Sequence, residues 1–288
     1  MSYSGQKRNW WIVLRGVGLL SVIAFAASAW AASEALVDEF MTKSGLVAQL
    51  AQVETGVLTG IEQARSQPQY PALSGDQLAR LQDATKAAYG ADRLRNAMRV
   101  QLQASLPVDD TEQALKWLET PFGKRVTAIE EAGSTLEAYQ RSMDIGAKTL
   151  ADLTPARKAD LERILKASGA VDLYASITLN QQLGVMRGLA LSSGMAAVPS
   201  TQEMKAKLDL YRSQIAGALA PTLLANAAVL YAPLSDTELR EYAVTLELPS
   251  SKRVTDAVGA ALDKVLSAAA VELGRRLGDT AKPTSTTT

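Results

Sequence analysis

We expect an all-α fold made of two tandem helical repeats that follow a signal peptide, and three observations predict it. The frame L-E-x-P-x-x-K-R-V-T occurs at Leu118–Thr127 and again, 128 positions later, at Leu246–Thr255. Apolar residues recur at steps of three or four, which is the spacing of one face of an amphipathic helix. No segment shows the apolar/polar alternation, bounded by hairpin turns, that is typical of strands.

The N-terminus has the three parts of a secretory signal peptide in order. Basic residues up to Arg15 precede the apolar stretch Gly16–Ala27, and the small-residue site A-W-A follows at residues 29–31. We expect cleavage after Ala31 and a periplasmic location. The alternative is an uncleaved anchor in the inner membrane, because Trp10–Ala32 approaches the roughly 20 residues that span a bilayer. We expect no other membrane span.

A second pair of similar segments supports a duplication. Met41–Val53 aligns with Leu165–Ile177 at an offset of 124 positions, so the second copy has gained four residues before the frame recurs. Capping-box patterns also occur in both copies, at Ser74-x-x-Gln77 and at Ser200-x-x-Glu203. The predicted organisation is a signal peptide at 1–31, repeat 1 at 32–150, repeat 2 at 151–278 and a disordered tail at 279–288.

Each repeat begins with a short helix that a Ser-Gly pair ends. These helices are expected at about Glu34–Lys43 and at Pro155–Lys166, where Thr154 caps a helix with proline in its first turn. A longer amphipathic helix and a polar loop follow in each repeat. The loops are expected at Ser66–Ser74 and Ser192–Ser200.

Three further helices complete repeat 2, and repeat 1 shows counterparts of the first two. The first is expected at about Gly75–Ser105 and at Thr201–Tyr231. The next begins at Asp109 or Asp110 in repeat 1 and at Ser235 in repeat 2, and the frame's proline ends it. The final helix of repeat 2 has one apolar face from Val254 to Leu277.

Charge and a glycine predict where this final helix ends. Arg275 and Arg276 are expected in its last turn, where positive charge complements the helix dipole. Gly278 is expected just beyond the helix, as its C-terminal cap. The Pro/Thr/Ser-rich segment Thr280–Thr288 has no apolar face to bury and accounts for the predicted tail.

Composition excludes several classes of chemistry. The chain has no cysteine and no histidine, so it lacks a thiol nucleophile, an imidazole base and a His/Cys metal site. Its 30 basic and 30 acidic residues form no basic stripe, and we therefore expect no nucleic-acid partner. We expect no metal and no cofactor.

The repeated frame allows a structural and a functional interpretation. As structure, proline forms a corner between two helices, Leu118 and Val126 pack beneath it, and Glu119 pairs with Lys124 or Arg125 across the turn. As a site, a cation pair near a carboxylate binds an anionic ligand. The candidate ligand-binding residues are Lys124, Arg125, Lys252, Arg253, Glu119 and Glu247.

No motif of a known enzyme class is present, so we predict no catalytic residue. Adjacent acidic pairs such as Glu130-Glu131 do not face each other on a helix and are expected to be solvated surface charge. A remote alternative is a carboxylate-based hydrolase, if Glu119 and Glu247 met at a pseudo-twofold axis.

The segment W-L-E-T-P-F-G-K at Trp117–Lys124, together with the Ser-Gly helix end and the export signal, resembles the bacterial family called domain of unknown function 2059. Repeat 2 departs from that pattern, with Thr245 in the aromatic position and Ser251 in the glycine position. The resemblance covers two tandem copies. It implies an exported helical protein of Gram-negative bacteria and supplies no catalytic residue.

We therefore expect a non-enzymatic protein that binds an envelope protein or a small ligand through a surface between its two repeats. The alternative is a carrier of lipid or another amphiphile, which long apolar helical faces in an exported protein favour.

Overall fold

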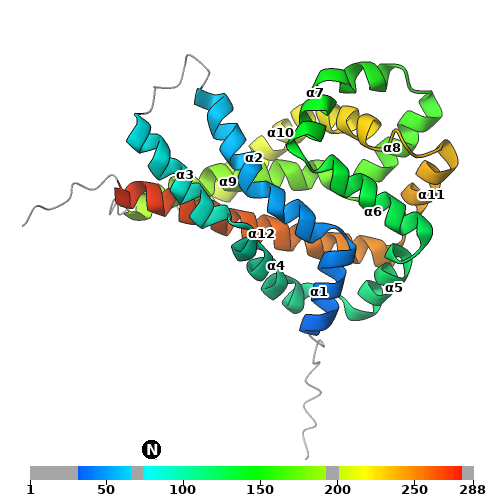
Figure 1. Cartoon of the computed structure of the whole chain (residues 1–288), viewed down its shortest axis with the longest axis horizontal. Helices are drawn as coiled ribbons and strands as arrows, with labels where there is room; N and C mark the ends of the chain where they lie inside the picture. Colours follow the sequence, from blue (N-terminus) through cyan, green and yellow to red (C-terminus); the bar gives the residue numbers. More distant parts are fainter. Residues whose placement is uncertain (1–31, 66–73, 193–200, 281–288) are drawn as a thin grey trace, which may run out of the picture. The chain divides into compact units, whose positions relative to one another are not determined.

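The structure is a computed structural model that describes residues 32–65, 74–192 and 201–280, and the described residues form helices joined by short turns, with no strand (Figure 1). The predicted all-α fold class is confirmed. The helices are α1 (Glu34–Lys43), α2 (Leu46–Arg65), α3 (Gly75–Tyr89), α4 (Ala91–Ser105), α5 (Val108–Leu118), α6 (Pro121–Gly133), α7 (Leu136–Ala151), α8 (Pro155–Ala167), α9 (Ala170–Ser192), α10 (Thr201–Leu230), α11 (Asp236–Glu247) and α12 (Pro249–Thr280).

Several predictions fall outside the described residues. They are the signal peptide, the interiors of both polar loops, the capping residue Ser200 and the tail beyond Thr280. These remain predictions. Residues Ala31–Thr288 form a unit of their own, and the fold is described within it.

The first helix of each predicted repeat ends as expected. α1 and α8 begin at capping residues Ser33 and Thr154, and each ends before a Ser-Gly pair. Gly45 and Gly169 have φ angles of 73° and 63°. This left-handed conformation is strained for residues with a Cβ atom, which explains glycine at both positions.

The prediction of a single helix over Gly75–Ser105 is wrong in one respect, because the segment forms two helices. Gly90 has an extended ψ of 137° and separates α3 from α4, while its counterpart α10 continues through Pro221. Helix α3 begins with the predicted capping box, in which Ser74 and Gln77 bond each other's backbone. The box at Ser235 is present as well.

The predicted end of the last helix is also wrong. α12 continues through Gly278 to Thr280, and a Cβ atom at Gly278 would lie 1.6 Å from the Ser192 hydroxyl. Gly278 is therefore a packing residue and not a cap. Arg275 and Arg276 pair with Glu272 at 3.0 and 2.7 Å instead of lying in the last turn.

The described residues form two hydrophobic cores, and neither follows the predicted boundary between repeats. The first combines α1–α5 of repeat 1 with α12 of repeat 2, as Val37 and Met98 share it with Val254 and Val265, and α9 of repeat 2 packs against it. In Figure 1, α12 crosses beside α3 and α4, in agreement with their contacts.

The second core combines α6 and α7 of repeat 1 with α8, α10 and α11 of repeat 2. Val126 of α6 lies with Leu161 of α8 and Leu239 of α11, and α7 packs chiefly against α10. Each predicted repeat thus places its last helical segment in the core of the other. The exchange joins both repeats into one folded unit.

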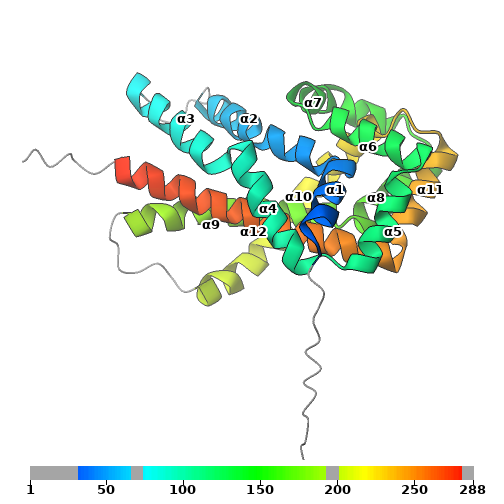
Figure 2. The ribbon, with the colours of Figure 1, turned by 60° about the horizontal axis from the view of Figure 1, so that its bottom comes forward.

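Helices α9 and α12 make the most extensive contact between any two helices described, and they lie side by side in Figure 2. A Cβ atom at Gly188 of α9 would lie 2.1 Å from the Val271 carbonyl oxygen, and one at Gly274 of α12 would lie 2.1 Å from that of Val185. Both glycines permit backbones to approach closer than side chains allow.

Helix α10 bears on the expectation of no membrane span besides the signal segment, which stays a prediction. Within the described residues, Tyr211–Leu230 is long and apolar enough to cross a membrane by length and composition alone, with a mean hydropathy of 1.3. Only 11% of this window is buried inside the unit. The same composition occurs in core helices of globular proteins, and α10 packs against α7 and α9.

Candidate functional site

The repeated frame forms a helix–helix corner in both copies, as the structural interpretation predicts. α5 ends at Leu118 and α6 begins at Pro121, and the Thr120 hydroxyl caps α6 by accepting from the Gly123 N–H at 2.9 Å. In copy two, α11 and α12 meet at Leu248, which has no side chain able to cap. Val126 is buried beneath the first corner.

The two frame glutamates pair with bases on the first helix of their own repeat. Glu119 accepts a hydrogen bond from Lys43 of α1, and Glu247 accepts two from Arg163 of α8, at 2.9 and 2.7 Å. These hydrogen bonds lower the pKa of both carboxyl groups. The predicted pairing of Glu119 with Lys124 or Arg125 is wrong, because Lys43 reaches its carboxylate from α1.

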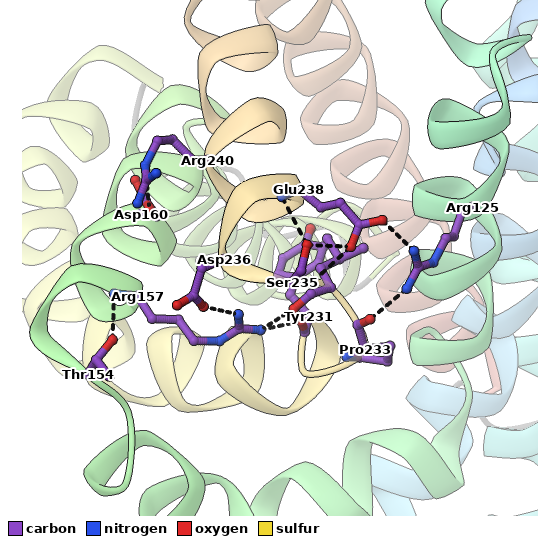
Figure 3. A network of polar contacts seen from close by, with 11 residues as sticks. Arg125, Thr154, Arg157, Asp160, Tyr231, Pro233, Ser235, Asp236, Glu238 and Arg240 are labelled. Atoms are coloured by element: carbon purple, nitrogen blue, oxygen red, sulfur yellow. Dashed lines mark hydrogen bonds and ion pairs between the residues drawn. The ribbon is translucent and has the colours of Figure 1, made fainter.

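The two frame arginines pair across the repeats. Arg253 of α12 donates to both oxygens of Asp110 in α5, at 2.6 and 2.7 Å. Arg125 of α6 donates to Glu238 of α11 and, at 2.7 Å, to the Pro233 carbonyl oxygen (Figure 3). The acids, like the arginines, are 128 positions apart, so the two ion pairs are equivalent and reciprocal.

A further arginine holds the same turn before α11. Arg157 of α8 donates to the carbonyl oxygens of Tyr231 and Leu234, both at 2.8 Å, and to Asp236 at 2.6 Å (Figure 3). Its side chain is 12% exposed. The guanidinium satisfies carbonyl groups that follow the end of α10, where no intrahelical donor is available.

The two frame lysines, Lys124 and Lys252, lie in different surroundings. Lys124 lines a pocket of about 250 Å³ together with Lys43, Glu119 and Glu131. Lys252 pairs with Asp256 one helical turn away, at 2.9 Å.

The structure does not bring the six candidate residues together. It gathers Glu119 and Lys124 at the small pocket, and places Arg125, Glu247 and Arg253 in separate ion pairs. Glu119 and Glu247 pair with bases on two different helices, Lys43 of α1 and Arg163 of α8, which does not support a two-carboxylate centre. Within the same residues, no cluster of three or more acidic groups is arranged to hold a metal.

Glu130 was expected to be a solvated charge, and that expectation is wrong. The hydroxyl groups of Tyr231 and Tyr242 each donate to its Oε1 atom at 2.7 Å, and Trp117 stacks on Tyr242 with ring centroids 5.7 Å apart. Burial raises the pKa of Glu130 despite both hydrogen bonds. Its position four residues after the buried Val126 places it on the inner face of α6, a signal the sequence already carried.

A larger groove lies where α7 of repeat 1 meets α8, α9 and α10 of repeat 2. Its volume is about 630 Å³, within the range of about 300 to 1,000 Å³ usual for small-molecule sites. Its uncharged lining residues are Leu150, Leu165, Gly169, Val171, Gly217, Ala220, Pro221 and Leu224, and its charged ones are Glu162, Lys166 and Asp172.

The middle of α10 shapes one wall of this groove. Pro221 has no N–H, so the Gly217 carbonyl oxygen has no backbone donor four residues ahead. A Cβ atom at Gly217 would meet no atom within 4 Å. The helix therefore presents an apolar, open surface with one backbone acceptor available.

Comparison with protein-family models, with curated proteins and with solved structures found no match for this chain. The resemblance to domain of unknown function 2059 accordingly stays a prediction.

Proposed function

We propose that the chain is a non-enzymatic binding protein of the cell envelope, and that its ligand is a small amphiphile held in the groove between α7, α8, α9 and α10. The observation that carries this proposal is the groove itself. It combines an apolar lining with charges of both signs at one wall, which is the usual composition of a small-molecule site.

The character of α10 supports the same ligand class. Tyr211–Leu230 has a mean hydropathy of 1.3, yet only 11% of this window is buried. An apolar chain laid along Ala220, Pro221 and Leu224 would remove such surface from water, at about 25 cal/mol per Å² of apolar area. A polar head would then remain near Lys166 at the opposite wall.

The frame residues favour architecture over ligand binding. Arg125 and Arg253 both hold carboxylates of the opposite repeat, so an anionic ligand would have to displace those partners. The role of the frame is then to fix the packing of α6 and α12. The groove depends on that packing because α7, which follows α6, supplies Leu150.

Export remains part of the proposal. The signal peptide predicted at 1–31, with cleavage after Ala31, delivers the chain to the periplasm, and an uncleaved signal would instead anchor it to the inner membrane. In both cases the groove would be exposed to envelope lipids.

Native mass spectrometry of the full chain purified from cells tests the proposal. We expect co-purifying lipid at one molecule per chain, and its loss in Gly217→Phe, because the new ring enters the open groove. Gly56→Phe on α2 is the matched control, since a Cβ atom there also meets no neighbour, and it should retain the lipid. Lipid absent from the parent, together with a specific protein partner in crosslinking, would replace the proposal with an adaptor role.

A further inference from the structure

The groove has walls of different polarity. Every charged lining residue comes from α8 or the first turn of α9, whereas α7 and α10 contribute uncharged residues only. A bound amphiphile is therefore oriented, with its chain against α7 and α10 and its polar head towards the turn at Gly169.

The charges on that wall have both signs. Glu162 precedes Lys166 by one helical turn, and Asp172 follows on the other side of the Gly169 turn. One ammonium thus lies between two carboxylates along the chain.

These charges also differ from those of the frame. The frame's arginines and glutamates are engaged by protein partners. Glu162, Lys166 and Asp172, in contrast, form no ion pair with another described residue, although the charge of Lys166 contributes to the lowered pKa of the Glu247 carboxyl group. Their side chains remain available to a ligand that carries charges of both signs.

Resting on the proposed function, we infer that the ligand is a zwitterionic single-chain amphiphile. Its anionic group pairs with Lys166, its ammonium group pairs with Glu162 or Asp172, and its chain lies along Leu150 and Leu224. A purely anionic amphiphile would meet the like charge of both carboxylates, and a purely cationic one would meet the like charge of Lys166, which disfavours each of them relative to the zwitterion.

Titration of the full chain with three probes of equal chain length tests this inference: a lysophosphatidylethanolamine, a fatty acid and an alkylamine. We expect the zwitterion to bind about fivefold more tightly than either other probe, the effect of one partly exposed ion pair. Lys166→Gln should remove the advantage over the alkylamine, and Asp172→Asn should reduce the advantage over the fatty acid. Lys158→Gln, the same change on α8 outside the groove lining, should change neither.

The outcomes separate the inference from the proposed function. Equal binding of the fatty acid or the alkylamine, blocked by Gly217→Phe, would overturn the zwitterion and leave the amphiphile groove standing. Binding of no probe, or binding that Gly217→Phe leaves unchanged, would overturn both. Unchanged selectivity in Lys166→Gln and Asp172→Asn would also overturn the zwitterion.

Discussion

Arg125 and Arg253 show how one residue type can be retained twice for a structural reason. Both occupy the second basic position of the frame, and each reaches an acid near the start of the helix that precedes the frame in the other repeat. Their sequence pattern suggested an anion site. The pattern alone could not name the partners, because Asp110 and Glu238 lie 143 and 113 positions away from their arginines.

Charge reversal of Arg253 tests this pairing. Arg253→Glu places two negative groups together and should lower the urea midpoint of unfolding. The swap Asp110→Arg with Arg253→Asp should be more stable than Arg253→Asp alone. Lys252→Glu, which opposes only the exposed Asp256, is the control and should have a smaller effect. A swapped variant no more stable than the single change would contradict the pairing.

The same ion pair predicts a dependence on pH. The Arg253 hydrogen bonds lower the pKa of Asp110 from its ordinary value of 3.8. The pair therefore contributes its full stability above that value and loses it as pH falls through the lowered pKa. In urea titrations between pH 2 and pH 6, Asp110→Asn should lose less stability on acidification than the parent. Equal losses would contradict the assignment.

For Glu130 we predict a pH dependence of stability with the opposite sign. Its pKa is raised by burial from the ordinary value of 4.5, so the folded chain favours the protonated group. That contribution is fully present below the ordinary value and is lost as pH rises through the raised pKa. The free energy of unfolding of the parent, relative to Glu130→Gln, should thus decrease with rising pH. Glu131→Gln is the control for loss of one charge. A difference independent of pH would contradict this account.

At the scale of helices, local sequence signals predicted that a helix exists and where it begins better than they predicted whether it continues without a break. The Ser74 capping box and the Ser-Gly ends at Gly45 and Gly169 were confirmed because each depends on backbone chemistry within a few residues. Whether a helix continues without a break depends on the residues that pack against it. Gly90 interrupts α3–α4, whereas α10 tolerates Pro221, although proline is the stronger helix breaker.

The α9–α12 contact gives a prediction at this scale. Gly188→Ala places a methyl group against the backbone of α12, and such overpacking should destabilise the chain by about 1–3 kcal/mol. Gly56→Ala in α2 meets no neighbour and should stabilise it by about 0.5–1 kcal/mol, the difference in helix propensity. Urea denaturation of both variants measures the contrast. Equal effects of the two substitutions would mean that the helices are not in backbone contact.

At the scale of the whole molecule, the sequence predicted two tandem repeats, and the cores show that each predicted repeat packs its last helical segment in the core of the other. α12 completes the core of α1–α5, and α6 with α7 completes that of α8, α10 and α11. Periodicity identified the apolar face of α12 but carries no information on which helices cover it. That choice rests on contacts more than 140 positions apart, such as the Arg253 pair.

The exchange is the central claim of this account, because it places α7 against α10 and so builds the groove. Asp152 in the turn between α7 and α8 is exposed, and a protease site inserted after it in the full chain allows the two halves to be separated covalently. After cleavage, size-exclusion chromatography in native buffer should show both fragments eluting together at the volume of the uncut chain, and they should part only in denaturant. Fragments that separate in native buffer while each stays folded would contradict the exchange.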